Sequence, residues 1–285
     1  MFGFLNVDKP SGITSHKVIS ILRKITGIKQ IGHAGTLDPL ASGVLPVAIG
    51  KASKLIDYLD EDKEYIAGIY LGKVSDTYDI QGKVESTFFR KISLEEIGEA
   101  LSSLTGKIWQ IPPAFSAVHY NGKRLYELAR KGKIPDDIPK REVKIYKNEI
   151  LSFDYEKQTL YLDIACSKGT YIRSIVNDLG VLLGSGAVMY ELKRIKSSGL
   201  SIENAIDISE NESEDFIKSH LINPIDIINI DTYELNDEEC DKLKNGNKFK
   251  DRKKKQGNIL LVRENKIMAI AEIQDKYVQP RRVLL

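Results

Sequence analysis

The sequence predicts an α+β fold in which one large domain is followed by a small β-rich domain. The chain has 285 residues, which is more than one average domain needs and less than three would fill. Segments with strand-like alternation and segments with the helical period of apolar residues both occur along it. Hydrophobic residues make up 42% and charged residues 29%, so a substantial core is expected.

The N-terminal part of the chain predicts a strand, a helix and a long loop. GFLNV at 3–7 suits a short strand, and the DKPSG segment after it is typical of a turn. Ser15 is expected to cap a helix that Gly27 ends, because apolar side chains follow the helical period at Val18, Ile21, Leu22 and Ile25. Residues 28–50 are rich in glycine and predict a loop with an apolar patch at 44–49.

The middle of the chain predicts further strands and helices. Strands are expected at 65–72 and 159–166, and helices at 94–104 and 171–184. Between them lies IWQIPPAFSAVHYNGKRLYELARKGKIP, whose double proline resists regular structure. The second half of this segment, KRLYELARKGK, predicts a basic helix.

Charge is distributed unevenly along the chain, although the net charge is only +2. The formal charge is +5 over residues 1–200, −12 over 201–241 and +9 over 242–285. Two basic surfaces separated by an acidic segment would suit a polyanion, but charged runs are also common on solvated faces. We expect a domain boundary near 225–230 and, beyond it, a hairpin that turns at Glu264 and Asn265.

Several classes of function are disfavoured by what the sequence lacks. MFGFLNVDKP meets charge early, and no apolar run approaches 18 residues, so neither a signal peptide nor a membrane span is expected. Cys166 and Cys240 lie far apart, which suits a reducing cytoplasm. We find no phosphate loop, dinucleotide fingerprint or nucleophile elbow, and the four histidines do not have metal-ligand spacing. The sequence therefore predicts neither a cofactor nor a metal.

One carboxylate, Asp38, lies in a run of small residues, GHAGTLDPLASGVLP. Asp38 followed by Pro39 is a favoured beginning for a helix, and a helix cap is the structural interpretation. That interpretation leaves the surrounding glycines, alanines and serine unexplained. Because small residues let a ligand approach the backbone closely, the alternative is a binding loop around a single acid.

Longer motifs around Asp38 resemble the TruB-type tRNA pseudouridine synthases. GHAGTLDPLASGVLPVAIGKASKL is similar to the signature of this family, and FLNVDKPSGITSH to its N-terminal motif. DKEYIAGIYLGKVSDTYDIQG, IPPAFSAVHYNGKRLYELARKG and CSKGTYIRSIVNDLG resemble its second motif, its RNA-facing segment and its third motif. The resemblance is collinear from about residue 4 to residue 200.

This resemblance implies a pseudouridine-synthase fold, with a central mixed, mainly antiparallel sheet whose active cleft crosses the middle. Residues 1–228 would form the catalytic domain, within which 105–145 would be an RNA-facing clasp. Residues 229–285, which end in QPRRVLL, resemble the small PUA-like RNA-binding domain of the family.

The reaction implied by the resemblance is the isomerisation of uridine 55 in the T loop of tRNA to pseudouridine. The N1–C1′ bond breaks, the base turns over, and C5 joins C1′. A hydrolase of glycosides usually needs two carboxylates, whereas here the base stays bound and one acid would suffice. Asp38 would be this acid, either attacking C1′ or removing the C2′ proton. The sequence leaves both roles open.

The resemblance assigns four further residues to the target base. Arg173 would keep Asp38 ionised, although it could instead contact a phosphate or lie on the surface. Tyr65 would stack on the base, and Leu192 would cover it; both are also ordinary core residue types. His33 would stack where the flipped nucleotide had been or against its neighbours.

The expected partner is the T arm of tRNA, bound by a cytoplasmic monomer without a guide RNA and without a membrane. Phosphate contacts would add affinity and salt dependence. The candidates are Lys9, Lys17, Lys123, Arg124, Arg130, Lys131 and the run 252–255. Two alternatives remain: a tRNA-binding or tRNA-folding module whose catalysis is dispensable, and a guide-dependent RNA pseudouridine synthase.

Overall fold

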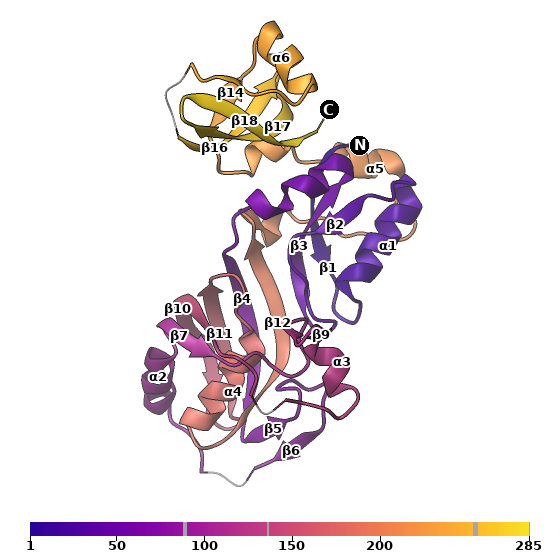
Figure 1. The fold of residues 1–285 in the computed structure, drawn as a ribbon. Helices are drawn as coiled ribbons and strands as arrows, with labels where there is room; N and C mark the ends of the chain where they lie inside the picture. The colour runs from indigo at the N-terminus through magenta and orange to yellow at the C-terminus, as the bar shows by residue number, and fades with distance from the viewer. Residues whose placement is uncertain (88–89, 136, 253–255, 285) are drawn as a thin grey trace.

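A computed structural model describes residues 1–87, 90–135, 137–252 and 256–284. It contains a large sheet and a separate C-terminal sheet that lies at one end of an elongated molecule (Figure 1). No helix in these ranges combines the length and the apolar character needed to cross a membrane.

The large sheet is mixed and mainly antiparallel, as predicted. Its strands follow the order β1 (Gly3–Lys9), β3 (Ser42–Ile49), β12 (Ala187–Ser197), β4 (Lys63–Leu71), β11 (Thr159–Cys166), β10 (Arg141–Asp154) and β7 (Gly106–Gln110). The short strands β2 (Ile31–His33) and β13 (Leu200–Ser201) pair with β3 and β12. The neighbours β3 and β12 run parallel, and the other neighbouring pairs of this sheet run antiparallel within the described residues.

Three helices cover the large sheet, and their sequence patterns explain why. Helix α1 (Ser15–Thr26) lies next to β2, α2 (Leu94–Ser103) against β10, and α4 (Ile172–Leu182) against β12. Each buries the apolar stripe that the helical period predicts, and each begins and ends within a few residues of its predicted position. The buried stripes are Val18, Ile19, Ile21 and Leu22 in α1, Ile97 and Leu101 in α2, and Ile175, Val176 and Leu179 in α4.

The prediction of a loop over 28–50 is wrong, because residues 42–49 form strand β3 of the large sheet. All of its residues from Gly43 to Ile49 are buried, and a strand buried on both faces shows a continuous apolar run rather than alternation. The apolar patch at 44–49 was therefore the signal of a strand. The glycines and the proline in this segment hid it.

The predicted cap of α1 is also wrong by one residue. Thr14 occupies the cap, and its side-chain oxygen accepts a hydrogen bond from the backbone N–H of Lys17 at 3.1 Å. Ser15 is instead the first helical residue, and its side chain is buried. The hydroxyl of Ser15 is thus available for a contact outside the helix.

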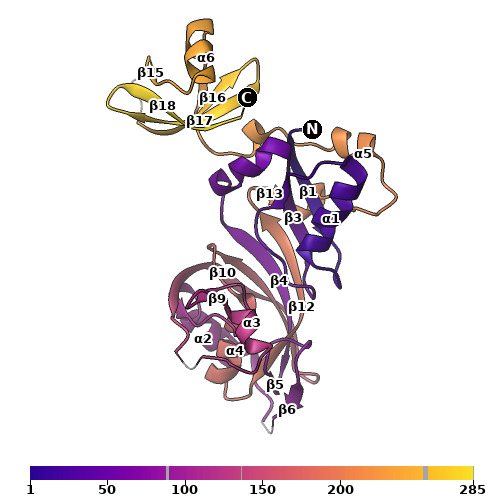
Figure 2. The ribbon, with the colours of Figure 1, turned by 45° about the vertical axis from the view of Figure 1, so that its right-hand side comes forward.

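Both ends of the segment 105–145, which is predicted to form a clasp, belong to the large sheet. Strand β7 and the beginning of β10 belong to the sheet, so the described residues between them, 111–135 and 137–140, lie outside it. They contain the hairpin of β8 (His119–Tyr120) and β9 (Lys123–Arg124), followed by α3 (Leu125–Ala129). The predicted basic helix is therefore only one short turn of helix. Both views place β9 and α3 far from the C-terminal sheet (Figures 1 and 2).

Shorter elements connect these parts. They are η1 (Gly50–Tyr58), β5 (Lys73–Ser75), β6 (Val84–Ser86), η2 (Ile202–Asn204), α5 (Glu214–Ser219) and η3 (Pro224–Asp226).

The C-terminal sheet has the order β14 (Thr232–Glu234), β16 (Gly257–Arg263), β17 (Lys266–Gln274), β18 (Tyr277–Val283) and β15 (Phe249–Lys250), with α6 (Asp237–Lys244) beside it. The predicted hairpin is confirmed: Glu264 and Asn265, with φ of 51° and 58°, form the turn between β16 and β17. Apolar side chains join this sheet to β1 and η1, among them Phe4, Leu55, Leu260 and Ile270. The two sheets therefore share a buried apolar contact.

Gly43 allows β3 and β12 to approach each other, which yields a stability prediction. Its φ is +101°, and a Cβ atom there would lie 2.1 Å from the carbonyl oxygen of Arg194. Gly199 has a φ of +74° but open space around it. We expect Gly199→Ala to cost about 1–2 kcal/mol from backbone strain alone, and Gly43→Ala to cost about 3 kcal/mol or more. Urea unfolding measures both; equal losses would contradict the close approach.

Candidate active site

A small pocket of about 100 Å³ borders β4 and β12, two neighbouring inner strands of the large sheet. It lies where the loop between β2 and β3 meets β4, β12 and the beginning of α4. The residues around it are Thr36, Leu37, Asp38, Tyr65, Thr170, Tyr171, Ile172, Arg173 and Leu192. Four of the five residues that the sequence assigned to the target base therefore meet in one pocket, although 154 positions separate Asp38 from Leu192 in the chain.

A larger groove of about 670 Å³ lies where the N-terminus and β17 of the C-terminal sheet meet. Its walls are apolar side chains together with three lysines and one glutamine, and none of its described residues is a carboxylate, a histidine or a cysteine. The smaller pocket, by contrast, combines a carboxylate, a phenol and a guanidinium in Asp38, Tyr65 and Arg173, which makes it the candidate active site.

Asp38 does not begin a helix, so the interpretation as a helix cap is wrong. The residues from 34 to 41 form a loop, in which the N–H of Ala41 donates to the carbonyl of Asp38 at 3.0 Å. Pro39 is the second residue of this turn, a position that its fixed φ favours. The tight turn directs the chain from the loop into β3, with Asp38 at the pocket.

The N-terminal segment before α1 holds this loop, a relation that sequence reasoning missed. The Ser15 hydroxyl accepts from the N–H of Leu37 at 2.9 Å and lies 3.1 Å from the carbonyl of the same residue, to which it donates. The N–H of Gly12 donates to Pro39 O at 2.7 Å, and the Ser11 hydroxyl to Leu40 O at 2.7 Å. These contacts flank Asp38 on both sides.

Arg173 is the cationic partner of Asp38. Its Nη2 lies 2.9 Å from Oδ2 of Asp38 and donates to the carbonyl of Phe115 at 3.0 Å, while Nη1 donates to the carbonyl of Thr77 at 3.2 Å. Nη1 also lies 3.5 Å from Oδ2 of Asp79, a buried second carboxylate. Asp79 lies inside the motif DTYDIQG, so its motif position was the one signal that could have identified it.

The electrostatic setting of Asp38 combines burial with opposing charges. Burial raises the pKa of Asp38, and the Arg173 guanidinium at 2.9 Å acts against this rise. Asp79 adds to the rise, whereas the charge of Lys9 lowers the pKa of Asp38. The side chain of Asp38 keeps 38% of its surface exposed, and the pocket lies beside it. A ligand in the pocket would thus reach a carboxylate otherwise surrounded by protein.

Lys9 does not lie on the surface, so the expectation that it contacts the RNA backbone is wrong. Its side chain is fully buried, and its Nζ donates to the carbonyls of Pro10 and Ile13 at 2.9 and 2.7 Å. Burial lowers the pKa of Lys9 to about 8, against the attraction of Asp38. Lys9 is therefore a buried cation that stabilises the N-terminal turn near Asp38.

Tyr65 and Leu192 each satisfy both interpretations that the sequence left open. Both are only 6% exposed and pack in the large apolar core, yet both also border the pocket. Burial raises the pKa of the Tyr65 hydroxyl, and the guanidinium of Arg194 opposes this rise. Arg194 is fully buried, and its guanidinium donates to the carbonyls of Val44 and Gly35. The sequence analysis did not predict this buried arginine.

His33 lies in β2, outside the residues that border the pocket. Burial, followed by the positive charge of Arg194, lowers the pKa of His33, so its ring is neutral at pH 7. Its Nδ1 is buried and has no hydrogen-bond partner in the described part of the protein. A stacking role at the entrance of the site therefore stays a prediction.

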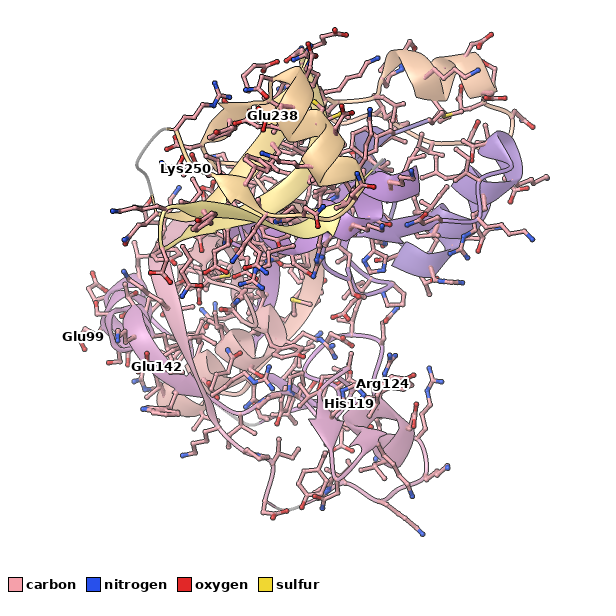
Figure 3. All side chains as sticks on the ribbon, turned by 45° about the horizontal axis from the view of Figure 1, so that its top comes forward. Glu99, His119, Arg124, Glu142, Glu238 and Lys250 are labelled. Carbon is pink, nitrogen blue, oxygen red and sulfur yellow. The ribbon has the colours of Figure 1, made fainter. Side chains whose placement is uncertain are left out.

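The remaining candidates for phosphate contacts divide into two groups. Lys123, Arg124, Arg130 and Lys131 are exposed on the segment 111–140, where Figure 3 shows Arg124 beside His119. Lys17 already pairs with Glu210 at 2.7 Å, and Arg252 with Glu239 at 2.6 Å. Residues 253–255 lie outside the described residues.

The described residues contain no cluster of three or more His, Cys, Asp or Glu side chains suited to a metal ion. The side chains around the pocket provide a carboxylate beside a guanidinium, two phenols and an apolar wall. Such a set can hold a flat ring against the tyrosines and the apolar wall while the carboxylate acts on an adjoining group.

Comparison with known proteins identifies the family. Residues 23–172 match the model of the TruB family pseudouridylate synthase (N terminal domain). The chain is 42% identical to tRNA pseudouridine synthase B of Lactobacillus acidophilus, over 99% of this chain and 98% of the relative. It is 44% identical to the protein of the same name from Clostridium tetani, over 89% and 87%.

Among solved structures, the crystal structure of a Cbf5-Nop10-Gar1 complex matches with a TM-score of 0.73. The match covers 100% of this chain and 85% of that chain at 24% identity, a similarity that concerns the fold. The family match and the relatives, taken with the pocket around Asp38, lead to one conclusion: the chain belongs to the TruB family of pseudouridylate synthases.

Proposed function

We propose that this protein converts uridine 55 in the T loop of tRNA to pseudouridine, with Asp38 as the essential acid. The observation that carries the proposal is the pairing of Asp38 with Arg173 in a small pocket next to Tyr65. The name of its relatives, tRNA pseudouridine synthase B, supports tRNA as the substrate. The position 55 comes from the resemblance of the motifs.

The size of the pocket supports a reaction in which the base leaves the RNA stack. About 100 Å³ suits one small ring and excludes a folded RNA element, so the uridine must be flipped out at a cost of a few kcal/mol. Tyr65 would stack on the flipped base, and Leu192 would cover it. His33, outside the pocket, would stack on the neighbouring nucleotides or in the vacated place.

The bond changes of the reaction balance without any further reagent. The N1–C1′ bond breaks, C5 bonds to C1′, and the proton that C5 loses is matched by the one that N1 gains. Asp38 acts at the sugar, either as a nucleophile at C1′ or as a base at C2′, and both roles require its ionised form. Among the described residues around the pocket it is the one carboxylate, which disfavours hydrolysis by a carboxylate pair.

Binding of the tRNA would extend beyond the pocket. The exposed basic side chains of Lys123, Arg124 and Arg130 on segment 111–140 would contact phosphates of the T arm. Residues 229–285 would act as a PUA-like RNA-binding domain. Lys17 would have to exchange its Glu210 partner for a phosphate to take part. We further propose that the protein acts as a monomer in the cytoplasm without a guide RNA.

Substitution of the acid separates catalysis from binding. We expect Asp38→Asn to lower the rate of pseudouridine formation on an unmodified T arm by about 10³-fold or more, with an unchanged Kd for the RNA. Glu99→Gln removes the same charge from an exposed position on α2 and should leave both values unchanged. An Asp38→Asn variant that still forms product would contradict the role of Asp38.

The same experiment decides between the alternatives. An RNA-binding or RNA-folding module would bind the T arm without product in any variant. A guide-dependent enzyme would form product only when further components are added to the purified protein.

The pH dependence tests the electrostatic role of Arg173. The reaction needs ionised Asp38, and burial raises the pKa of this residue. As the pH is lowered, the single-turnover rate should therefore begin to fall at a pH above the usual pKa range of an aspartate. Removal of the opposing cation in Arg173→Gln should raise this pKa further and move the acidic limb to higher pH. Arg173→Lys keeps a charge, so its limb should move less. Identical limbs in all three proteins would show that Arg173 does not control the ionisation of Asp38.

A further inference from the structure

The loop that carries Asp38 is held mainly from outside itself. Apart from the turn between Asp38 and Ala41, residues 34–41 contain no regular structure. Three residues before and at the beginning of α1, namely Ser11, Gly12 and Ser15, hydrogen-bond to its backbone. We call these three residues the loop clamp. They belong to the motif FLNVDKPSGITSH, to which the proposed reaction assigns no role.

Ser15 is the buried member of the loop clamp. Its side chain is 2% exposed, and its hydroxyl satisfies both backbone groups of Leu37, accepting from N at 2.9 Å and donating to O at 3.1 Å. A hydroxyl can do both at once because it has one donor and two lone pairs. Both hydrogen bonds are buried, so water cannot replace the hydroxyl if it is removed.

The position of these bonds matters because the other half of the ion pair is already fixed. Arg173 is held by the carbonyls of Thr77 and Phe115 and by Asp79, all outside the loop. Its distance of 2.9 Å to Asp38 therefore depends on where the loop places the backbone of residue 38. Leu37 directly precedes that residue, and Ser15 determines the orientation of the peptide groups around it.

We infer that Ser15 is a positioning residue for the proposed isomerisation: its hydroxyl fixes Leu37 and thereby sets Asp38 against Arg173. The inference rests on the proposed function. Ser15 does not touch the substrate and acts only through the loop. Because a displacement of about 1 Å at a reacting group can cost 10²-fold in rate, loss of this hydroxyl should slow the chemical step.

The test compares Ser15→Ala with two neighbours in the single-turnover reaction on an unmodified T arm. Thr14→Ala removes the cap of α1, and Ser20→Ala removes an exposed hydroxyl bonded to the carbonyl of His16 in the same helix. Thr14→Ala reports the effect of destabilising α1, and Ser20→Ala the effect of the same chemical substitution. We expect Ser15→Ala to be about 10- to 100-fold slower, with an unchanged Kd, while both control variants stay within about twofold of the wild-type rate.

Two further readouts distinguish positioning from simple loss of stability. In Ser15→Ala the acidic limb of the rate should move to higher pH, because Asp38 is no longer held against Arg173, whereas Thr14→Ala should keep the wild-type limb. Ser15→Thr restores a hydroxyl and should recover most of the rate. Amide hydrogen exchange over residues 36–41 should be faster in Ser15→Ala alone, whether or not the protein is active.

The outcomes separate the two claims. If the wild type forms no pseudouridine on tRNA, the proposed function fails, and the exchange data still show whether Ser15 holds the loop. If the wild type is active and Ser15→Ala matches Thr14→Ala in rate and pH profile, the positioning role is wrong.

Discussion

The ion pair between Asp38 and Arg173 is the interaction on which the rest of the site depends. Arg173 comes from the second residue of α4 and is almost completely buried, with hydrogen bonds to the backbone of two other segments. Asp38 comes from a loop between strands on the other side of the pocket. The large sheet is thus needed mainly as a rigid frame that keeps these two side chains at 2.9 Å while leaving room beside them for one ring.

Burial of this ion pair affects both the access of water to Asp38 and the ionisation of its carboxyl group. Partial burial limits the access of water to Asp38, but it also favours the protonated form of this carboxylic acid. The protein opposes this with a guanidinium in direct contact and with the buried ammonium of Lys9 nearby. Asp79, on the far side of Arg173, shares the same cation and so limits its effect on Asp38. The balance of these charges sets the fraction of ionised acid.

The parts of the fold that could be predicted are those specified by local patterns. Helix α2, helix α4 and the hairpin at Glu264 and Asn265 have their own period or turn residues, and they lie where expected. Strand β3 was missed because a strand buried on both faces has no alternation, and neighbouring glycines mimic a loop. Strand β1, which is distant in sequence, pairs with this segment from Gly43 to Ile49, and local patterns do not encode that pairing.

The candidate site shows the same division. The motifs that resemble the family identified Asp38 and Arg173, but the motif that contains Lys9 and Ser15 gave no indication of where those side chains point. A lysine after a strand suggests a surface position, yet Lys9 is buried; a serine before a helix suggests a cap, yet Ser15 holds the loop of Asp38. The role of Ser15 depends on a contact with Leu37, which is 22 residues away, and local propensity does not encode it.

The most direct test of this account is to incubate the purified protein with an unmodified full-length elongator tRNA transcript and to map every pseudouridine at nucleotide resolution. The account predicts one modified position, uridine 55, formed without added RNA, protein or cofactor. Absence of pseudouridine, or its appearance only at other positions, would contradict it.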